Sequence, residues 1–208
     1  MIKNIIFDVG MVLVDFCWRD VMDSLGFKGE ILEAVADATV RSGIWNEYDR
    51  SRMSDEEILQ ACIGHAPHLE KEIRLFWDHL GGSIREYPYA EEWVRSFKAR
   101  GYSCYVLSNY ARRTYELTKG ELGFLKEMDG VVFSYQLNLI KPEPEIYQAL
   151  LARYSLDPSE CVFLDDNAAN IRAAEEQGIC VIRFLGYEDG KKKLEELLER
   201  EAKNLITG

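Results

Sequence analysis

Five short apolar runs constrain the fold of this 208-residue chain more than any other feature. They lie at 4–7, 103–107, 131–134, 161–164 and 180–184. Short apolar runs without polar alternation are typical of strands that are buried on both faces of a parallel sheet. Helical patterns at 89–99, 143–154 and 168–177 separate the later runs. Strands that alternate with helices predict a parallel sheet with right-handed crossovers.

The interval between the first two runs is too long for a single crossover, because it holds about seventy residues. Helical periodicity recurs within it at 30–41, 54–63 and 68–80. Ser54 and Glu57 have the spacing of a capping box ahead of apolar Ile58. We therefore predict a Rossmann-like α/β core formed by 1–14 and 88–208. A helical-bundle cap is inserted at 15–87, and the charged segment 190–203 forms a closing helix.

Composition excludes several classes of partner. The net charge of −11 argues against a nucleic-acid surface. No apolar stretch approaches the roughly 18 residues of a membrane span. The first run is too short for the apolar part of a signal peptide, so we expect a cytoplasmic protein without a membrane partner. Five scattered cysteines without a CxxC pair indicate buried thiols. The sequence leaves the oligomeric state open.

Polar residues with distinct chemistry follow four of the apolar runs. In chain order they are Asp8, Ser108, Asn109, Lys141, Asp165 and Asp166. The carboxyl ends of parallel strands meet at one edge of a sheet, so we expect these side chains to converge. This set of side chains suits a nucleophilic attack on phosphorus. It offers a carboxylate nucleophile, a hydroxyl donor, a cation and two further acids. Each residue alone also fits a structural role, such as an Asx turn at Asp8, or a helix N-cap at one of the two acids Asp165 and Asp166.

The order of these motifs resembles that of the haloacid dehalogenase-like (HAD) hydrolase superfamily over nearly the whole chain. The segments that carry the resemblance are Phe7-Asp8-Val9-Gly10, Leu107-Ser108-Asn109, Lys141-Pro142-Glu143-Pro144-Glu145-Ile146-Tyr147 and Leu164-Asp165-Asp166-Asn167, which leads to Asn170. The third segment is similar to the subfamily with a small helical cap. The resemblance implies that Asp8 forms an aspartyl-phosphate. It also implies that Ser108, Asn109 and Lys141 bind the phosphate, with Lys141 acting in catalysis.

The paired acids indicate a metal site. Adjacent carboxylates repel each other unless a cation lies between them, and hard oxygen ligands suit Mg²⁺. The resemblance implies that Asp8, Asp166 and the Gly10 carbonyl bind the metal. It implies that Asp165 acts through a metal-bound water, while Asn170 supports these ligands. We therefore expect a Mg²⁺-dependent phosphatase that acts on a small phosphorylated metabolite.

One position departs from the pattern of the family. Most of its phosphatases carry a second Asp two residues after the nucleophile as general acid and base, and that position is Gly10 here. Three interpretations follow. The loop resembles the Asp-x-Gly-Asn-Val of α-D-glucose-1-phosphate phosphatases and their relatives, except at Met11. Alternatively, the protein is a catalytically impaired module that binds a phosphometabolite or a partner. A 2-haloacid dehalogenase also lacks the second Asp, but its reaction requires no metal, so Asp165 and Asp166 count against it.

The cap should select the substrate, because the phosphate site lies beneath it. The candidate residues are Phe16, Trp18, Arg19, Trp45, Tyr48 and Arg52. Either they line the cleft and suit a sugar or another polar body, or they form the cap's own core.

Overall fold

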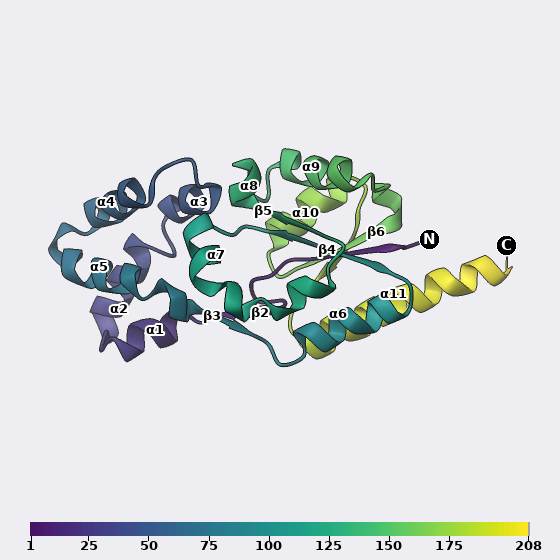
Figure 1. The fold of residues 1–208 in the computed structure, drawn as a ribbon, viewed down its shortest axis with the longest axis horizontal. Helices are drawn as coiled ribbons and strands as arrows, with labels where there is room; N and C mark the ends of the chain where they lie inside the picture. The colour runs from purple at the N-terminus through teal and green to yellow at the C-terminus, as the bar shows by residue number, and fades with distance from the viewer. Residues whose placement is uncertain (208) are drawn as a thin grey trace.

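The five apolar runs form one parallel sheet in the computed structural model, which describes residues 1–207 (Figure 1). The strands are β1 (Asn4–Phe7), β4 (Ser103–Ser108), β5 (Gly130–Phe133), β6 (Cys161–Asp165) and β7 (Cys180–Arg183). Their order in the sheet is β5-β4-β1-β6-β7. Phe7 of the central β1 lies opposite Val106 of β4 and Leu164 of β6. The predicted α/β class with a parallel core is confirmed.

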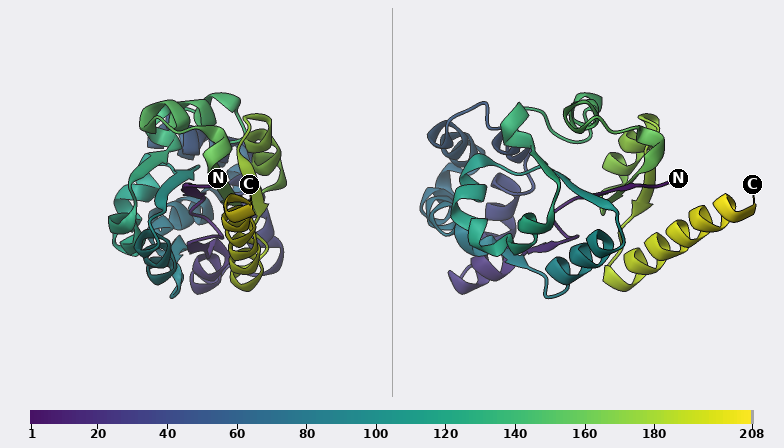
Figure 2. Two further views of the ribbon diagram at one scale, coloured as in Figure 1. Left: turned by 90° about the vertical axis from the view of Figure 1, so that its right-hand side faces the viewer. Right: turned by 45° about the vertical axis from the view of Figure 1, so that its right-hand side comes forward.

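Helices cover both faces of this sheet (Figures 1 and 2). One face carries α9 (Pro144–Tyr154) and α10 (Ala168–Glu176), which pack on Ile6 of β1. The opposite face carries α6 (Ala90–Ala99) and α11 (Tyr187–Thr207), which pack with Ile5 and Phe7. This division follows from the strand geometry, because successive side chains point to opposite faces.

Shorter elements complete the core. They are α7 (Arg112–Thr118), α8 (Ser134–Leu137) and the 3₁₀ turns η3 (Lys119–Glu121), η4 (Gly123–Glu127) and η5 (Pro158–Glu160). Within residues 1–207 we find no helix with the length and apolar character that crossing a bilayer requires.

A bundle of helices extends beyond one end of the sheet (Figure 1). It contains α1 (Trp18–Ser24), α2 (Gly29–Ala38), α3 (Gly43–Arg50), α4 (Asp55–His65) and α5 (Glu70–Asp78), with the 3₁₀ turns η1 (Pro67–Leu69) and η2 (Leu80–Ser83). These helices share an apolar cluster of their own. An antiparallel ribbon of β2 (Val14–Phe16) and β3 (Ile84–Glu86) lies where the bundle leaves and rejoins the core. The cap boundaries at 15 and 87 stay a prediction, which this ribbon supports.

The capping box predicted for α4 is confirmed. Ser54 Oγ accepts a hydrogen bond from the Glu57 N–H, and the Glu57 carboxylate accepts one from the Ser54 N–H. Two cap helices, α1 and α3, were not predicted, because each is short and α3 buries only Tyr48. The closing helix starts at Tyr187 rather than 190. Gly190 lies inside it, where a Cβ would collide with the ring of Phe184, so its glycine permits close packing.

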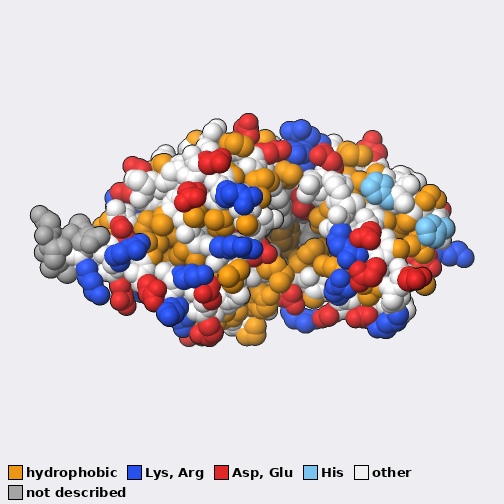
Figure 3. Space-filling view, turned by 180° about the vertical axis from the view of Figure 1, so that it is seen from behind, with side chains coloured by type: hydrophobic (Ala, Val, Ile, Leu, Met, Phe, Trp, Pro, Cys, Tyr) orange, Lys and Arg blue, Asp and Glu red, His pale blue; other side chains and the backbone are white. Residues whose placement is uncertain are grey.

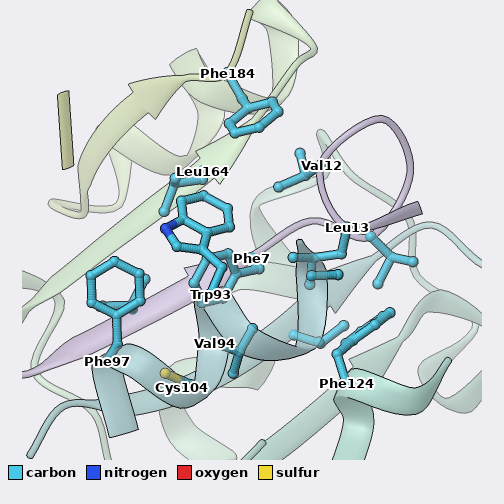
Figure 4. Packing of buried hydrophobic residues seen from close by; sticks show 14 of the residues in the cluster. Phe7, Val12, Leu13, Trp93, Val94, Phe97, Cys104, Phe124, Leu164 and Phe184 are labelled. Atoms are coloured by element: carbon cyan, nitrogen blue, oxygen red, sulfur yellow. The ribbon is translucent and has the colours of Figure 1, made fainter. Parts of the chain in front are cut away.

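Aromatic packing fixes the central strand (Figure 4). The ring of Phe7 lies 5.3 Å from that of Trp93 and 6.5 Å from that of Phe97, both on α6. All three side chains are buried in the cluster beneath the sheet. Because Phe7 immediately precedes Asp8, this contact also fixes the start of the loop that carries Asp8.

We predict that Phe97→Ala lowers the free energy of unfolding by about 3–5 kcal/mol, because it leaves a cavity against Phe7 and Trp93. Chemical denaturation measures this change. Leu185→Ala is the control, since Leu185 is 66% exposed and its truncation should change stability by less than about 0.5 kcal/mol. Equal effects of the two substitutions would contradict the packing described here.

Candidate active site

The polar residues predicted from the strand ends meet at one edge of the sheet. Asp8 follows β1, Ser108 ends β4 and Asp165 ends β6, and these three strands are neighbours. A cavity of about 290 Å³ lies beside them. Its lining includes Asp8, Gly10, Ser108, Asn109, Lys141, Asp166 and Asn170. In a space-filling view, the molecule is visibly hollowed between its two lobes (Figure 3).

Lys141 joins two of the loops. Its ammonium lies 2.8 Å from Asp8 Oδ1 and 2.7 Å from Asp165 Oδ2, and its side chain is almost wholly buried. Burial opposes the charged form, but Asp165 and Asp8 outweigh it and raise the pKa of Lys141 above its ordinary value. The ammonium therefore stays charged at neutral pH. As a compact point charge, it neutralises the acids on either side.

Asn109 has a role that the sequence did not indicate. Its Oδ1 accepts a hydrogen bond from the Lys141 N–H at 2.7 Å, and its Nδ2 donates to the Lys141 carbonyl at 3.0 Å. The side chain thus holds the backbone of Lys141, whose peptide bond to Pro142 is cis. A contribution of Asn109 to phosphate binding would therefore come from its main-chain N–H.

Asp165 is fully engaged within the protein. Besides Lys141, its carboxylate accepts hydrogen bonds from Asn170 Nδ2 at 3.0 and 3.1 Å and from the Asn167 N–H at 2.7 Å. The carboxylate is buried and is absent from the cavity lining. Its contacts suit a residue that orients Lys141 and holds the loop, and they leave little room for direct metal binding.

Asp8 is costly to ionise in this setting. Burial raises its pKa to about 7, Lys141 opposes this effect and Asp165 adds to it. Hydrogen bonds from the Val9 N–H at 2.7 Å and from the Ser108 hydroxyl favour the carboxylate form. One lysine therefore does not offset the burial of this carboxylate. Additional positive charge in the cavity would favour the ionised carboxylate of Asp8.

The acidic residues at this edge of the sheet could bind a cation that supplies this positive charge. Carboxylate oxygens of Asp8, Asp165 and Asp166 all lie within 4.8 Å of one another. Asp166 is only partly buried and lines the cavity together with Asp8 and Gly10. Burial first, and then the neighbouring Asp165, raise the pKa of Asp166. Hard oxygen donors beside an open cavity fit a Mg²⁺ ion.

The loop after Asp8 is a tight turn. Met11 has a φ of 59°, in the left-handed region that Asn adopts more readily than Met. Its N–H nevertheless closes the turn onto the Val14 carbonyl at 2.7 Å. A Cβ at Gly10 would meet no atom within 4 Å. Crowding therefore does not explain the missing acid at position 10.

The candidate cap residues divide into two groups. Phe16 and Trp45 line the cavity, with ring centroids 6.1 Å apart. Tyr48 is buried in the cap core and hydrogen-bonds to Thr114 at 2.9 Å. Trp18, Arg19 and Arg52 do not line the cavity; Arg19 stacks on Trp18 and pairs with Glu33. Among the described residues, the cap thus contributes aromatic surface but no cationic side chain to this cavity.

Sequence reasoning missed one cap acid in the cavity lining, Asp49. It lies on α3 four residues after Trp45, so both occupy the same face of that helix. The four-residue spacing between Trp45 and Asp49 could have indicated that both face the cavity. It was not used, because α3 itself was not predicted. Tyr110 and Thr114 of the core also line the cavity and were not predicted.

Polar contacts fasten α3 to the core. Ser134 Oγ donates to the Asp49 carbonyl at 2.7 Å, and Asn138 Nδ2 donates to the Arg50 carbonyl at 2.9 Å. The Arg50 guanidinium binds both carboxylate oxygens of Glu143, at 2.8 and 2.7 Å. These contacts set the position of α3 relative to the strand ends.

Comparison with known proteins identifies the family. Residues 2–178 match the family model of haloacid dehalogenase-like hydrolases. The chain therefore belongs to the haloacid dehalogenase-like hydrolases, as its motif order predicted.

Similar proteins include both phosphatases and larger proteins. The chain is 36% identical to mouse (Mus musculus) acyl-CoA dehydrogenase family member 10, covering 94% of this chain but only 19% of that protein. It is 27% identical to D-ribitol-5-phosphate phosphatase of Bacteroides thetaiotaomicron, covering 95% of this chain and 99% of that protein. A crystal structure of a HAD family enzyme from Bacteroides thetaiotaomicron, in complex with magnesium and inorganic phosphate, matches with a TM-score of 0.67 at 23% identity. That match covers 88% of this chain and 93% of the other.

We predict that Glu143→Gln destabilises the protein by about 1 kcal/mol at pH 7, because it replaces a two-point ion pair with a weaker neutral contact. The bond from Arg50 holds the pKa of Glu143 below its ordinary value of 4.5. A depressed carboxyl pKa stabilises the fold above that value, and this contribution is lost as the pH falls through the folded-state pKa. The difference between wild type and variant should therefore shrink below pH 4.5.

Denaturation curves across this pH range measure the effect. Glu145→Gln is the matched control, since Glu145 is exposed in the first turn of α9, the helix that Glu143 immediately precedes. A stability difference for Glu143→Gln that stays constant with pH would contradict the assigned ion pair.

Proposed function

We propose that this protein is a Mg²⁺-dependent phosphatase that hydrolyses a small phosphate ester through an aspartyl-phosphate on Asp8. The observation that carries the proposal is Lys141, whose ammonium lies between Asp8 and Asp165 beside a cavity that Asp166 also lines. The phosphatase from Bacteroides thetaiotaomicron and the magnesium and phosphate complex named above support the reaction class. We also propose that the protein acts in the cytoplasm, as expected from the sequence.

Each residue has a defined part in this proposal. An oxygen of Asp8 attacks phosphorus in line with the leaving oxygen, and the ester bond breaks. Lys141 neutralises charge on Asp8 and on the phosphate, while the Ser108 hydroxyl and the Asn109 main-chain N–H bind phosphate oxygens. Water then attacks the aspartyl-phosphate, which releases phosphate and restores Asp8.

Asp8, Asp166 and the Gly10 carbonyl would hold the Mg²⁺, with Asp165 acting through a bound water and Asn170 supporting them. When bound, the ion supplies positive charge that favours the ionised nucleophile and the phosphate. Ser108, Asn109 and Lys141 would position the phosphorus beside Asp8.

The loop at 8–12 supports a relationship to the α-D-glucose-1-phosphate phosphatase-like branch. An anomeric oxygen leaves more readily than a simple alkoxide, so it requires less protonation. The left-handed backbone at Met11 suits the Asn that this branch carries there. We therefore include sugar phosphates among the substrates to be tested first.

Two alternatives remain as outcomes of the same test. The first alternative follows from Gly10, which replaces the second Asp of the family. The protein would then be a catalytically impaired module that binds phosphate without hydrolysing an ester. A 2-haloacid dehalogenase would release halide in the presence of a chelator, and the cluster of Asp8, Asp165 and Asp166 argues against that reaction.

We predict that a panel of sugar phosphates and activated aryl phosphates shows phosphate release that requires Mg²⁺ and stops with a chelator. Asp8→Asn should reduce the rate by a factor on the order of 10⁴ or more, because it removes the nucleophile at nearly constant shape. Phosphate release is measured directly, with circular dichroism to verify the fold. Unchanged turnover in a folded Asp8→Asn protein would disprove the assignment.

A further inference from the structure

The cap places one carboxyl group in the cavity that the proposed chemistry has not used. Asp49 lines the cavity together with Asp8 and Lys141. No hydrogen bond or ion pair of its side chain is found within residues 1–207, whereas its main-chain carbonyl accepts the bond from Ser134. Asp49 is only partly buried, and its carboxyl group keeps its hydrogen-bonding capacity for the cavity that it lines. The carboxyl group of Asp49 is thus available to a ligand in the cavity.

The position of Asp49 is fixed by the core. Ser134 Oγ donates to the Asp49 carbonyl, accepts the Tyr110 N–H at 2.8 Å and lies at the start of α8. Tyr110 follows β4 by two residues, next to Ser108 and Asn109 of the phosphate site. One hydroxyl therefore ties the helix that carries Asp49 to the loop that carries the phosphate-binding residues.

Other titratable groups in the cavity lining already have partners or roles. Asp8 is the nucleophile, Lys141 bridges two acids and Asp166 belongs to the metal cluster. The Tyr110 hydroxyl is hydrogen-bonded to Thr118 at 2.7 Å, and burial raises its pKa well above the ordinary value. Among the titratable residues that line this cavity, Asp49 is the one left to transfer a proton.

We propose that Asp49 is the general acid and base of the phosphatase reaction, in place of the carboxylate that is missing at position 10. This inference rests on the proposed function. In the first step, Asp49 gives its proton to the ester oxygen while an Asp8 oxygen bonds to phosphorus, and the free alcohol leaves. In the second step, the Asp49 carboxylate removes a proton from the attacking water, phosphate departs and Asp49 is protonated again.

The electrostatic surroundings suit both steps. Burial raises the pKa of Asp49 to about 7, Lys141 lowers it in opposition and Asp8 adds a smaller increase. Asp166 is the remaining charged side chain in the lining of this cavity. A catalytic acid works best when its pKa lies near the working pH, because both protonation states are then populated.

The dependence of the rate on the leaving group tests this role. General acid catalysis contributes about 10²–10⁴-fold when the leaving group needs a proton. In Asp49→Asn, we expect kcat/KM for an alkyl phosphate to fall by a factor in that range. For 2,4-dinitrophenyl phosphate, whose anion leaves without a proton, kcat/KM should fall by less than about tenfold. A merely structural role would reduce both values alike.

Asp37→Asn is the matched control, because Asp37 is an exposed cap acid on α2 that pairs with Arg41. It should leave both kcat/KM values unchanged. Circular dichroism verifies the fold of each variant. If Asp49→Asn does not fold, Asp49→Ser removes the acid without enlarging the side chain and gives the same comparison.

The outcomes separate this inference from the proposed function. If the wild type hydrolyses neither phosphate with Mg²⁺, the phosphatase proposal itself fails. If the wild type is active and Asp49→Asn loses nothing, or loses equally on both substrates, the role of Asp49 is overturned while the phosphatase stands. A loss confined to the alkyl phosphate supports Asp49 as the proton donor.

Discussion

The buried ammonium of Lys141 is the interaction on which the site depends. It lies within hydrogen-bond distance of both Asp8 and Asp165 and has almost no exposed surface. A buried charge is tolerated only when it is paired, and removing one partner is strongly unfavourable. The ammonium therefore ties the loop before α9 to the ends of β1 and β6. Ion pairs thus connect segments that are far apart in the sequence, whereas apolar contacts stabilise the core.

The same site carries more negative than positive charge. Asp8, Asp165 and Asp166 oppose a single lysine, and a phosphate ester would add further negative charge. Burial raises the pKa of Asp8, Lys141 opposes this effect, and the negative charge of Asp165 adds to it. A divalent cation in the cavity would offset this negative charge. The overall charge of −11 makes such local compensation more important for an anionic substrate.

Much of the core was predictable because its signals are local. The first strand matches its predicted bounds; β4, β6 and β7 differ by one residue at the carboxyl end, and β5 is shifted by one residue, because each buried strand is centred on a short apolar run. The convergence of Asp8, Ser108 and Asp165 was predictable because each residue follows or ends an apolar run, and the carboxyl ends of parallel strands meet at one edge of the sheet. The bond from Asn109 to Lys141 and the approach of Asp49 did not, because both depend on packing between distant segments. Helix α3 was missed, since eight residues with one buried side chain carry too little periodicity.

The central claim is that Asp8 receives the phosphoryl group beside a bound Mg²⁺. A crystal structure of the protein with Mg²⁺ and beryllofluoride tests it most directly, because that complex imitates an aspartyl-phosphate. We expect density continuous with a carboxylate oxygen of Asp8 and a cation in contact with Asp8 and Asp166. A fluoride complex bound away from Asp8, or a cation that binds elsewhere, would contradict the account.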